Sequence, residues 1–260
     1  VTDAIALQDL QGQFTSGNGL DGTFTGRVNG GAEVTGRLVP QNDRSAIRLT
    51  APDAGRVLAS AGVLQQARGG AMELILLPVG TGGSFDGTLK VRDTSIVDAP
   101  AMAALLNAVS IVGLFNVEGS DSLFFSEVDA DFRLSPAQIT LREGSATGPS
   151  MGISMDGIYA TDTGKLQMQG VLTPVYLLNG VGSIFTRKGE GIFAFNYSLT
   201  GTAKDPDVFV NPLTGLVPGG IRDLFRAPRP EVPRAEGEPV PEPAPKRRRA
   251  SDLDISQQER

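Results

Sequence analysis

The chain has 260 residues, carries a net charge of −6 and contains no His, Cys or Trp. This composition excludes zinc sites built from Cys and His, thiol nucleophiles, disulfide bonds and any Ser-His-Asp triad. The acidic balance disfavours nucleic-acid binding, because neutralising phosphates requires a basic surface. Glycine is abundant, at 33 residues, and aromatic residues are few, which is typical of an all-β chain with many tight turns.

Residues 1–50 carry a repeat of about ten residues. Phe-Thr or Val-Thr pairs begin at Phe14, Phe24 and Val34. This period fits one short strand plus a turn, so we expect consecutive antiparallel strands; chance enrichment of Thr, Gly and Arg is the alternative. Residues 17–21 resemble one turn of a calcium-binding repeat, but a single copy cannot build that site, and we expect a hairpin turn there. Because this region looks like the middle of a repeating sheet, we expect the chain to be part of a longer protein.

Two helices are expected in the next part of the chain. Residues 53–66 begin at Asp53, a candidate N-cap, and place apolar side chains on one face. Residues 99–117 follow a similar Asp98-Ala99-Pro100 opening and are apolar over most of the helix circumference. Such a helix packs against a sheet or lies at a lipid interface, and we favour the sheet.

Strands alternate with turns over most of the remaining chain. In residues 128–134, Val128, Ala130, Phe132 and Leu134 share one face, and Asp129 and Asp131 share the other. The two carboxylates superficially resemble an acid/base pair, but their polar face predicts solvated surface instead. The other expected strands cover residues 71–78, 87–93, 137–143, 150–159 and 165–172, with a turn at Asp162-Thr163-Gly164.

Residues 170–225 stand out because their apolar segments carry almost no ionisable groups. They read as an apolar helix-like segment, a charged turn, two aromatic-rich strands and a terminal helix. Residues 227–260 are rich in Pro and in both signs of charge, which predicts a disordered tail. We expect its basic run, Lys246 to Arg249, to be solvated rather than bound to lipid. The predicted organisation is therefore a β domain over residues 1–226 and a tail over residues 227–260.

The expected fold is mainly β: an elongated, curled antiparallel sheet with an apolar groove. Two or three short helices pack on the sheet or cap it. Each alternating strand offers one apolar and one polar face, so a long series of them leaves an apolar side that must be covered or occupied.

Residues 53–225 resemble the C-terminal region of bacterial AsmA-like proteins of the alphaproteobacterial type. The resemblance is densest over residues 170–180, and the strands upstream are generic β pattern. The motifs that carry it are Asp53-Ala54-Gly55 with Val57-Leu58, Gly69-Gly70 before Met72-Glu73-Leu74, Asp98-Ala99-Pro100, Gly170-Val171-Leu172-Thr173-Pro174-Val175-Tyr176-Leu177-Leu178-Asn179-Gly180, Gly189-Glu190-Gly191 with Phe193 and Phe195, Leu199-Thr200-Gly201-Thr202, Asp205-Pro206, Val210-Asn211-Pro212-Leu213, Pro218-Gly219 and Leu224-Phe225.

The resemblance implies a lipid-transfer function in the cell envelope. AsmA-like proteins resemble the bridge-like lipid-transfer superfamily, in which repeated strands form a long sheet with an apolar groove. They are anchored in the inner membrane, project through the periplasm and are associated with phospholipid movement and outer-membrane integrity. By this resemblance, the chain is the periplasmic portion of such a protein, and its partners are phospholipid, a membrane surface and other envelope proteins.

Candidate site residues follow from the apolar faces. Acyl chains gain roughly 0.8 kcal/mol per buried methylene, so a smooth apolar lining holds them without specific polar contacts. We expect Phe193, Phe195, Tyr197 and Leu199 to line the groove, or else Ile192 and Ala194 from the other face. Further lining candidates are Val128, Phe132 and Leu134. Val175, Tyr176, Leu177, Leu178, Ile184 and Phe185 are expected to form a helix that closes the groove end or lies on a membrane.

Two other classes of function remain open at this point. One is a structural envelope protein whose sheet is covered by its own helices and binds no lipid. The other is an enzyme that uses Asp and Glu alone, which requires several carboxylates converging in one cleft, and the spacing predicts no such cluster. We therefore expect no catalytic residue, no metal and no cofactor.

Overall fold

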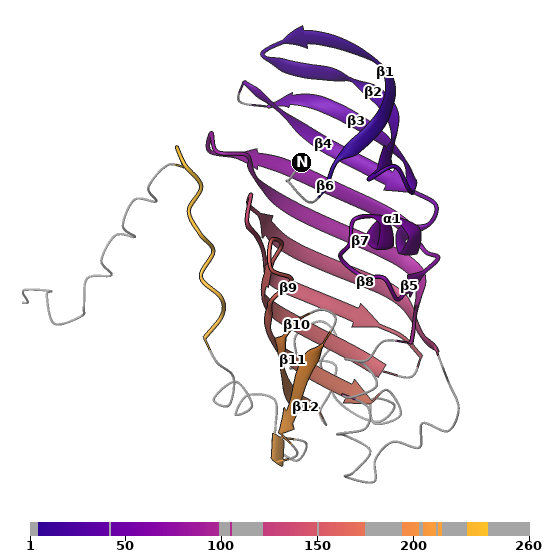
Figure 1. The fold of residues 1–260 in the computed structure, drawn as a ribbon, viewed down its shortest axis with the longest axis vertical. Helices are drawn as coiled ribbons and strands as arrows, with labels where there is room; N and C mark the ends of the chain where they lie inside the picture. Colours follow the sequence, from indigo (N-terminus) through magenta and orange to yellow (C-terminus); the bar gives the residue numbers. More distant parts are fainter. Residues whose placement is uncertain are drawn as a thin grey trace, which may run out of the picture.

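The fold is one large antiparallel β-sheet (Figure 1). A computed structural model describes residues 5–41, 43–98, 105, 122–149, 151–174, 194–202, 205–211, 213–214 and 228–238. Within these residues the strands cross the sheet in chain order, β1 and β13 form its two open edges, and β5 alone leaves this order by pairing with β7. The strands are β1 (Leu7–Gly17), β2 (Gly19–Val28), β3 (Glu33–Gln41), β4 (Arg44–Ala51), β5 (Ala67–Arg68), β6 (Ala71–Val79), β7 (Ser84–Val97), β8 (Ser122–Leu134), β9 (Gln138–Thr147), β10 (Met151–Ala160), β11 (Leu166–Pro174), β12 (Phe195–Gly201) and β13 (Pro206–Asn211).

The prediction of a mainly β, antiparallel architecture is confirmed. The strands expected from the ten-residue repeat are β1, β2 and β3, which pair consecutively. Burial alternates along β2, where Phe24 and Val28 are buried and the Thr and Arg residues between them are exposed. This alternation follows from the two-residue period of a strand that has one covered face.

Tight turns join neighbouring strands where the sequence supplies suitable residues. Asn29 and Gly30 both have positive φ, 46° and 71°, as the two central residues of a type I′ turn require, and the Gly31 N–H donates to the Val28 carbonyl at 2.8 Å. The expected turn at residues 162–164 is present: the Thr163 N–H donates to Asp162 Oδ1 at 2.7 Å, and Gly164 has φ 68°. The stretch that resembled a calcium repeat is the β1–β2 hairpin turn, as predicted.

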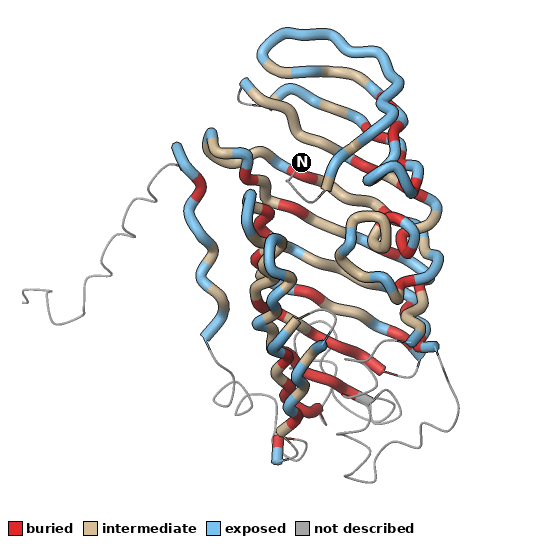
Figure 2. Tube along the Cα trace, viewed as in Figure 1, coloured by how far each residue is buried: buried red, intermediate tan, exposed pale blue. Residues whose placement is uncertain are grey.

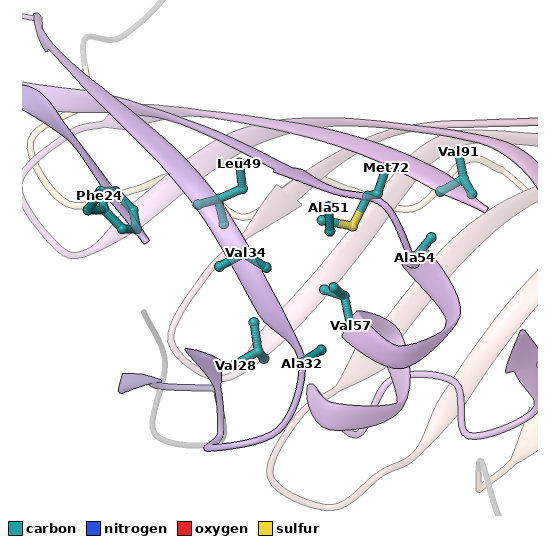
Figure 3. Close-up of a cluster of buried hydrophobic side chains, with 10 residues drawn as sticks. All are labelled: Phe24, Val28, Ala32, Val34, Leu49, Ala51, Ala54, Val57, Met72 and Val91. Carbon is teal, nitrogen blue, oxygen red and sulfur yellow. The ribbon is translucent and has the colours of Figure 1, made fainter. Parts of the chain in front are cut away.

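The described residues contain one α-helix, α1 (Ala54–Ser60). It begins at the predicted N-cap, where Asp53 Oδ1 accepts a hydrogen bond from the Arg56 N–H at 2.9 Å. The helix ends earlier than the predicted range of 53–66, since Gly62 just beyond it takes a positive φ of 71°. Ala54 and Val57 of α1 pack on the sheet (Figure 3).

The other expected helices fall almost entirely outside the described residues. From the range 99–117 only Leu105 is described; it is helical and buried in a hydrophobic cluster with Phe125 and Phe195. Residues 175–193 and 215–227 are not described, so the helices predicted there stay predictions.

A bulge in β9 keeps the faces of the sheet aligned. Leu141 pairs with Phe132 and Gly144 pairs with Ala130, so β9 holds one extra residue between these two pairs. The register of β9 against β10 shifts in the same segment. Because of the extra residue, Leu141 and Gly144 both stay opposite residues of the apolar rows, and Arg142 in the bulge points toward Asp86.

Glycines face aromatic rings across neighbouring strands. Gly36 pairs with Phe24, and Gly87 pairs with Phe132. A Cβ atom at either glycine would overlap the partner's ring, so each ring lies over the glycine. The small residue and the flat ring together keep this face of the sheet smooth.

We predict that Gly87→Ala lowers the free energy of unfolding by about 1–3 kcal/mol, because the added methyl group displaces the Phe132 ring. Chemical denaturation measures the change. Gly17→Ala is the matched control, since no heavy atom lies within 4 Å of the position that its methyl group would take, and it should have almost no effect. Equal stability of the two variants would contradict the proposed packing.

Candidate functional site: the apolar face of the sheet

The strand register gathers apolar residues on one face, which we call the apolar face. Residues paired across antiparallel strands project to the same side of the sheet. Three rows of such pairs contain only apolar residues and glycine, and the only side-chain polar group, the Tyr197 hydroxyl, donates to the Ser154 carbonyl at 3.0 Å. Row 1 is Phe14, Gly22, Leu38, Ile47, Leu76, Gly87, Phe132, Leu141, Gly157, Met168, Leu199 and Val208; row 2 is Gly12, Phe24, Gly36, Leu49, Leu74, Leu89, Ala130, Gly144, Met155, Gly170, Tyr197 and Val210; row 3 is Ala51, Met72, Val91, Val128, Ala146, Ile153, Leu172 and Phe195.

The opposite face, the polar face, has a very different composition. Arg48 and Glu73 form an exposed ion pair on it at 2.7 Å. Asp129 and Asp131 lie there, as predicted, and Asp131 accepts a hydrogen bond from the Thr88 hydroxyl. Across the part of the chain that the structure describes, His, Cys, Asp and Glu side chains form no group that could hold a metal ion. One row of pairs runs through Thr25, Thr35, Thr50, Glu73, Lys90, Asp129 and Ser145.

Row 3 belongs to the hydrophobic core. Its residues from β4, β6 and β7 pack with α1 in an N-terminal core, and its residues from β10, β11 and β12 pack in a C-terminal core. Val128 contacts both clusters and so links them. Burial increases from the first strands toward the last: Figure 2 shows exposed residues in the β1–β2 hairpin and mostly buried residues in β10 and β12.

Rows 1 and 2 are less completely covered in the middle of the sheet. Several of their side chains, most of them large, are neither buried nor fully exposed, and none of them is ionisable. We call this set the open stripe. It consists of Leu38, Ile47, Leu74, Leu89, Ala130, Phe132, Leu141, Met155 and Met168, from β3 to β11.

The described candidate residues of β8 and β12 lie on the apolar face. Phe195, Tyr197 and Leu199 lie in rows 3, 2 and 1, and each is nearly fully buried. Val128 lies in row 3 and Phe132 in row 1, and both are half-buried. Leu134 is buried one pair beyond row 1, opposite Phe85. Ala194 is buried just before β12. The candidates outside the described residues are Phe193, Ile192, Val175, Tyr176, Leu177, Leu178, Ile184 and Phe185.

Sequence reasoning did not single out the residues of the open stripe in β3, β4 and β6. Alternation in β3 and β4 points to Leu38 and Ile47, but short strands of mixed composition give a weak signal. In β6, the run Leu74-Ile75-Leu76-Leu77 is apolar at every position, so only the pairing with β7 assigns its faces.

A second arrangement, on the polar face, centres on Arg133. Its side chain is only 5% exposed. The guanidinium group donates to both carboxylate oxygens of Asp86 and both of Glu238, and to the Pro233 carbonyl, at 2.8–3.3 Å. These acceptors use every N–H of the group, and Arg142 adds a bond to Asp86 at 2.9 Å.

The ion pairs shift the pKa values of Arg133 and Glu238. Hydrogen bonds that the guanidinium donates to Asp86 and Glu238 hold the pKa of Arg133 above its ordinary value, so the guanidinium stays charged. The hydrogen bond from Arg133 lowers the pKa of Glu238 below its usual value of 4.5. Arg234, on the same segment as Glu238, adds a smaller favourable charge.

Glu238 and Pro233 belong to residues 228–238, which we call the strap. The sequence predicted no structure for this Pro-rich segment, yet it lies beside the sheet with specific contacts (Figure 1). No sequence signal pairs Arg133 with a carboxylate so far along the chain, so this network was not foreseen.

Comparison with protein-family models, curated proteins and solved structures finds no match for this chain. The resemblance to AsmA-like proteins therefore stays a prediction from the motifs quoted above. No helix within the described residues is long and apolar enough to cross a membrane.

We predict that Arg133→Lys lowers the free energy of unfolding by about 1–2 kcal/mol, because an ammonium group cannot bind the two carboxylates of Asp86 and Glu238 in bidentate fashion. Arg142→Lys is the control, since Arg142 is more exposed and makes one ion pair. Denaturant unfolding compares the two variants, and equal losses would show that the Arg133 network adds little.

We also predict a pH dependence for Glu238. Its pKa is lower in the folded state than in the unfolded chain, so its stabilising effect is present above pH about 4.5 and is lost as the pH falls through the folded pKa. The difference in unfolding free energy between the native chain and Glu238→Gln should be constant from pH 5 to 7 and shrink below about pH 4. A difference that stays constant into the acid range would argue against the ion pair.

Proposed function

We propose that the apolar face binds the acyl chains of phospholipids, and that the protein is a non-enzymatic lipid-binding component of the bacterial cell envelope. The observation that supports this most strongly is the unbroken composition of rows 1 and 2 from β1 to β13. A sheet that only needs a core can tolerate polar residues where its face is half-exposed. Here the open stripe contains none, which favours an apolar occupant.

The lining suits a chain that moves along it. Each buried methylene contributes roughly 0.8 kcal/mol, so a few contacts hold an acyl chain without a specific polar group. Glycines and flat-lying rings, as at Gly36 with Phe24, leave few pockets in which a chain would be trapped. The phospholipid headgroup stays in water, and the lipid slides along the stripe.

The resemblance to AsmA-like proteins gives the proposal its cellular setting. In this setting the protein is the periplasmic portion of an inner-membrane-anchored protein, conducts phospholipid between the inner and outer membranes and supports outer-membrane integrity. A membrane surface and envelope proteins are its further partners.

A structural role without lipid is the second candidate. It draws support from the burial of row 3 and of the C-terminal core, where Leu172, Phe195 and Tyr197 are packed as in an ordinary protein interior. The two candidates differ in whether the open stripe contacts lipid, and photo-crosslinking distinguishes them.

We predict that p-benzoylphenylalanine in place of Phe132 crosslinks to phospholipid in cells, since this residue lies in the open stripe. Phe124 is the matched control. It lies on the same strand and is 44% exposed. Alternation is interrupted between the two positions, where Ser126 and Glu127 are both exposed, and the neighbouring Phe125 packs in the C-terminal core. Phe124 therefore projects away from the apolar face. Mass spectrometry of the crosslinked protein identifies the adduct.

Lipid adducts at position 132 and not at position 124 would support lipid binding. Adducts at neither position, in a protein whose unfolding transition is unchanged, would favour the structural role. Equal labelling at both positions would indicate non-specific contact with membranes and would contradict a binding face.

A further inference from the structure

The strap crosses a stretch of the polar face that lies behind the open stripe. At one end, the Pro228 carbonyl accepts a hydrogen bond from Gln169 of β11 at 3.5 Å. At the other end, the Glu236 carbonyl accepts bonds from the Thr81 N–H at 2.6 Å and the Thr81 hydroxyl at 3.2 Å, in the turn between β6 and β7. The strap therefore reaches across β7 to β11.

The strap is only about 6 Å longer than the distance that it crosses. Its prolines favour an extended conformation, in which the steps from Pro228 to Glu236 span about 25 Å at roughly 3.1 Å per residue. The strands from β7 to β11 are separated by four spacings, or about 19 Å. A segment of this length, fixed at both ends, limits how far the strands can spread on the polar face.

The centre of the strap docks on a preformed receptor. Asp86 and Arg142 orient the Arg133 guanidinium from two neighbouring strands, and the remaining N–H groups point to the Pro233 carbonyl and Glu238. The Ala235 N–H closes the arrangement by donating to Glu238 Oε2 at 2.8 Å. This geometry fits an extended peptide with a carboxylate at its end.

The strap binds mostly through polar contacts at the surface. Ala235 is its one buried residue, whereas the sheet that it crosses has two hydrophobic cores. Segments with few buried apolar contacts open at much lower free energy than the core beneath them. Release of the strap is therefore expected while the sheet stays folded.

We propose that the polar face carries a binding site for an extended peptide that presents a carboxylate to Arg133, and that the chain's own strap occupies it as a releasable clamp on β7 to β11. The clamp sets the curvature of the sheet behind the open stripe, and its effect on lipid rests on the proposed function above. The site itself does not depend on that function.

A disulfide in the full chain tests the site, and the absence of native cysteine makes the test clean. A Cβ atom at Gly82 would lie 3.2 Å from Glu236 Cβ, near the separation that a disulfide needs. We expect Gly82→Cys/Glu236→Cys to form an intramolecular disulfide on mild oxidation. Gly82→Cys/Glu231→Cys is the control, because Glu231 lies five residues earlier on the strap, about 15 Å away at roughly 3.1 Å per residue. Equal oxidation of both pairs, or a disulfide joining two chains, would show that the strap does not bind to the sheet of its own chain.

Hydrogen exchange of the same variant tests the clamp without lipid. The oxidised form should show at least about tenfold slower amide exchange in β7 to β9 than the reduced form. Glu238→Ala should show faster exchange there than the native chain. Unchanged exchange in both comparisons would overturn the clamp, whereas a missing lipid adduct at position 132 would bear only on the proposed function.

Discussion

The structure depends on the register of its strands. In an antiparallel sheet, a slip of one residue turns every side chain of a strand to the other face. Rows 1 and 2 stay apolar through successive hairpins only because each pair of strands keeps its register. Where β9 carries an extra residue, the bulge at Arg142 restores the alignment of Leu141 and Gly144 with their partners. One amphipathic sheet, rather than several small ones, is the result.

The apolar face that this register creates has a buried part and a half-covered part. Row 3 and the two ends of row 2 supply the core, with α1 over β4 to β7 and the C-terminal core over β10 to β12. The open stripe is left half-covered, and the proposed lipid site lies there. On the reverse side, the Arg133 network holds the strap across β7 to β11, where we propose that it acts as a clamp.

Much of this architecture was predictable from local sequence, because its determinants are local. Alternation in residues 128–134 assigned Val128 and Phe132 to the apolar face and Asp129 to the polar one, and Asp53 marked the start of α1. The strap, the bulge and the Arg133–Glu238 pair were not foreseen, since each depends on contacts between distant segments. The face on which each β6 residue lies could not be predicted either, because a run that is apolar at every position shows no alternation.

The proposed binding of acyl chains on the apolar face can be measured by native mass spectrometry of the full chain, purified from bacterial cells under mild conditions. We expect protein carrying phospholipid, with occupancy that falls several-fold when Leu89 of the open stripe is replaced by Lys and is unchanged when Thr88 on the polar face is replaced by Lys. Protein that carries no lipid, or equal occupancy in both variants, would rule out lipid binding on this face.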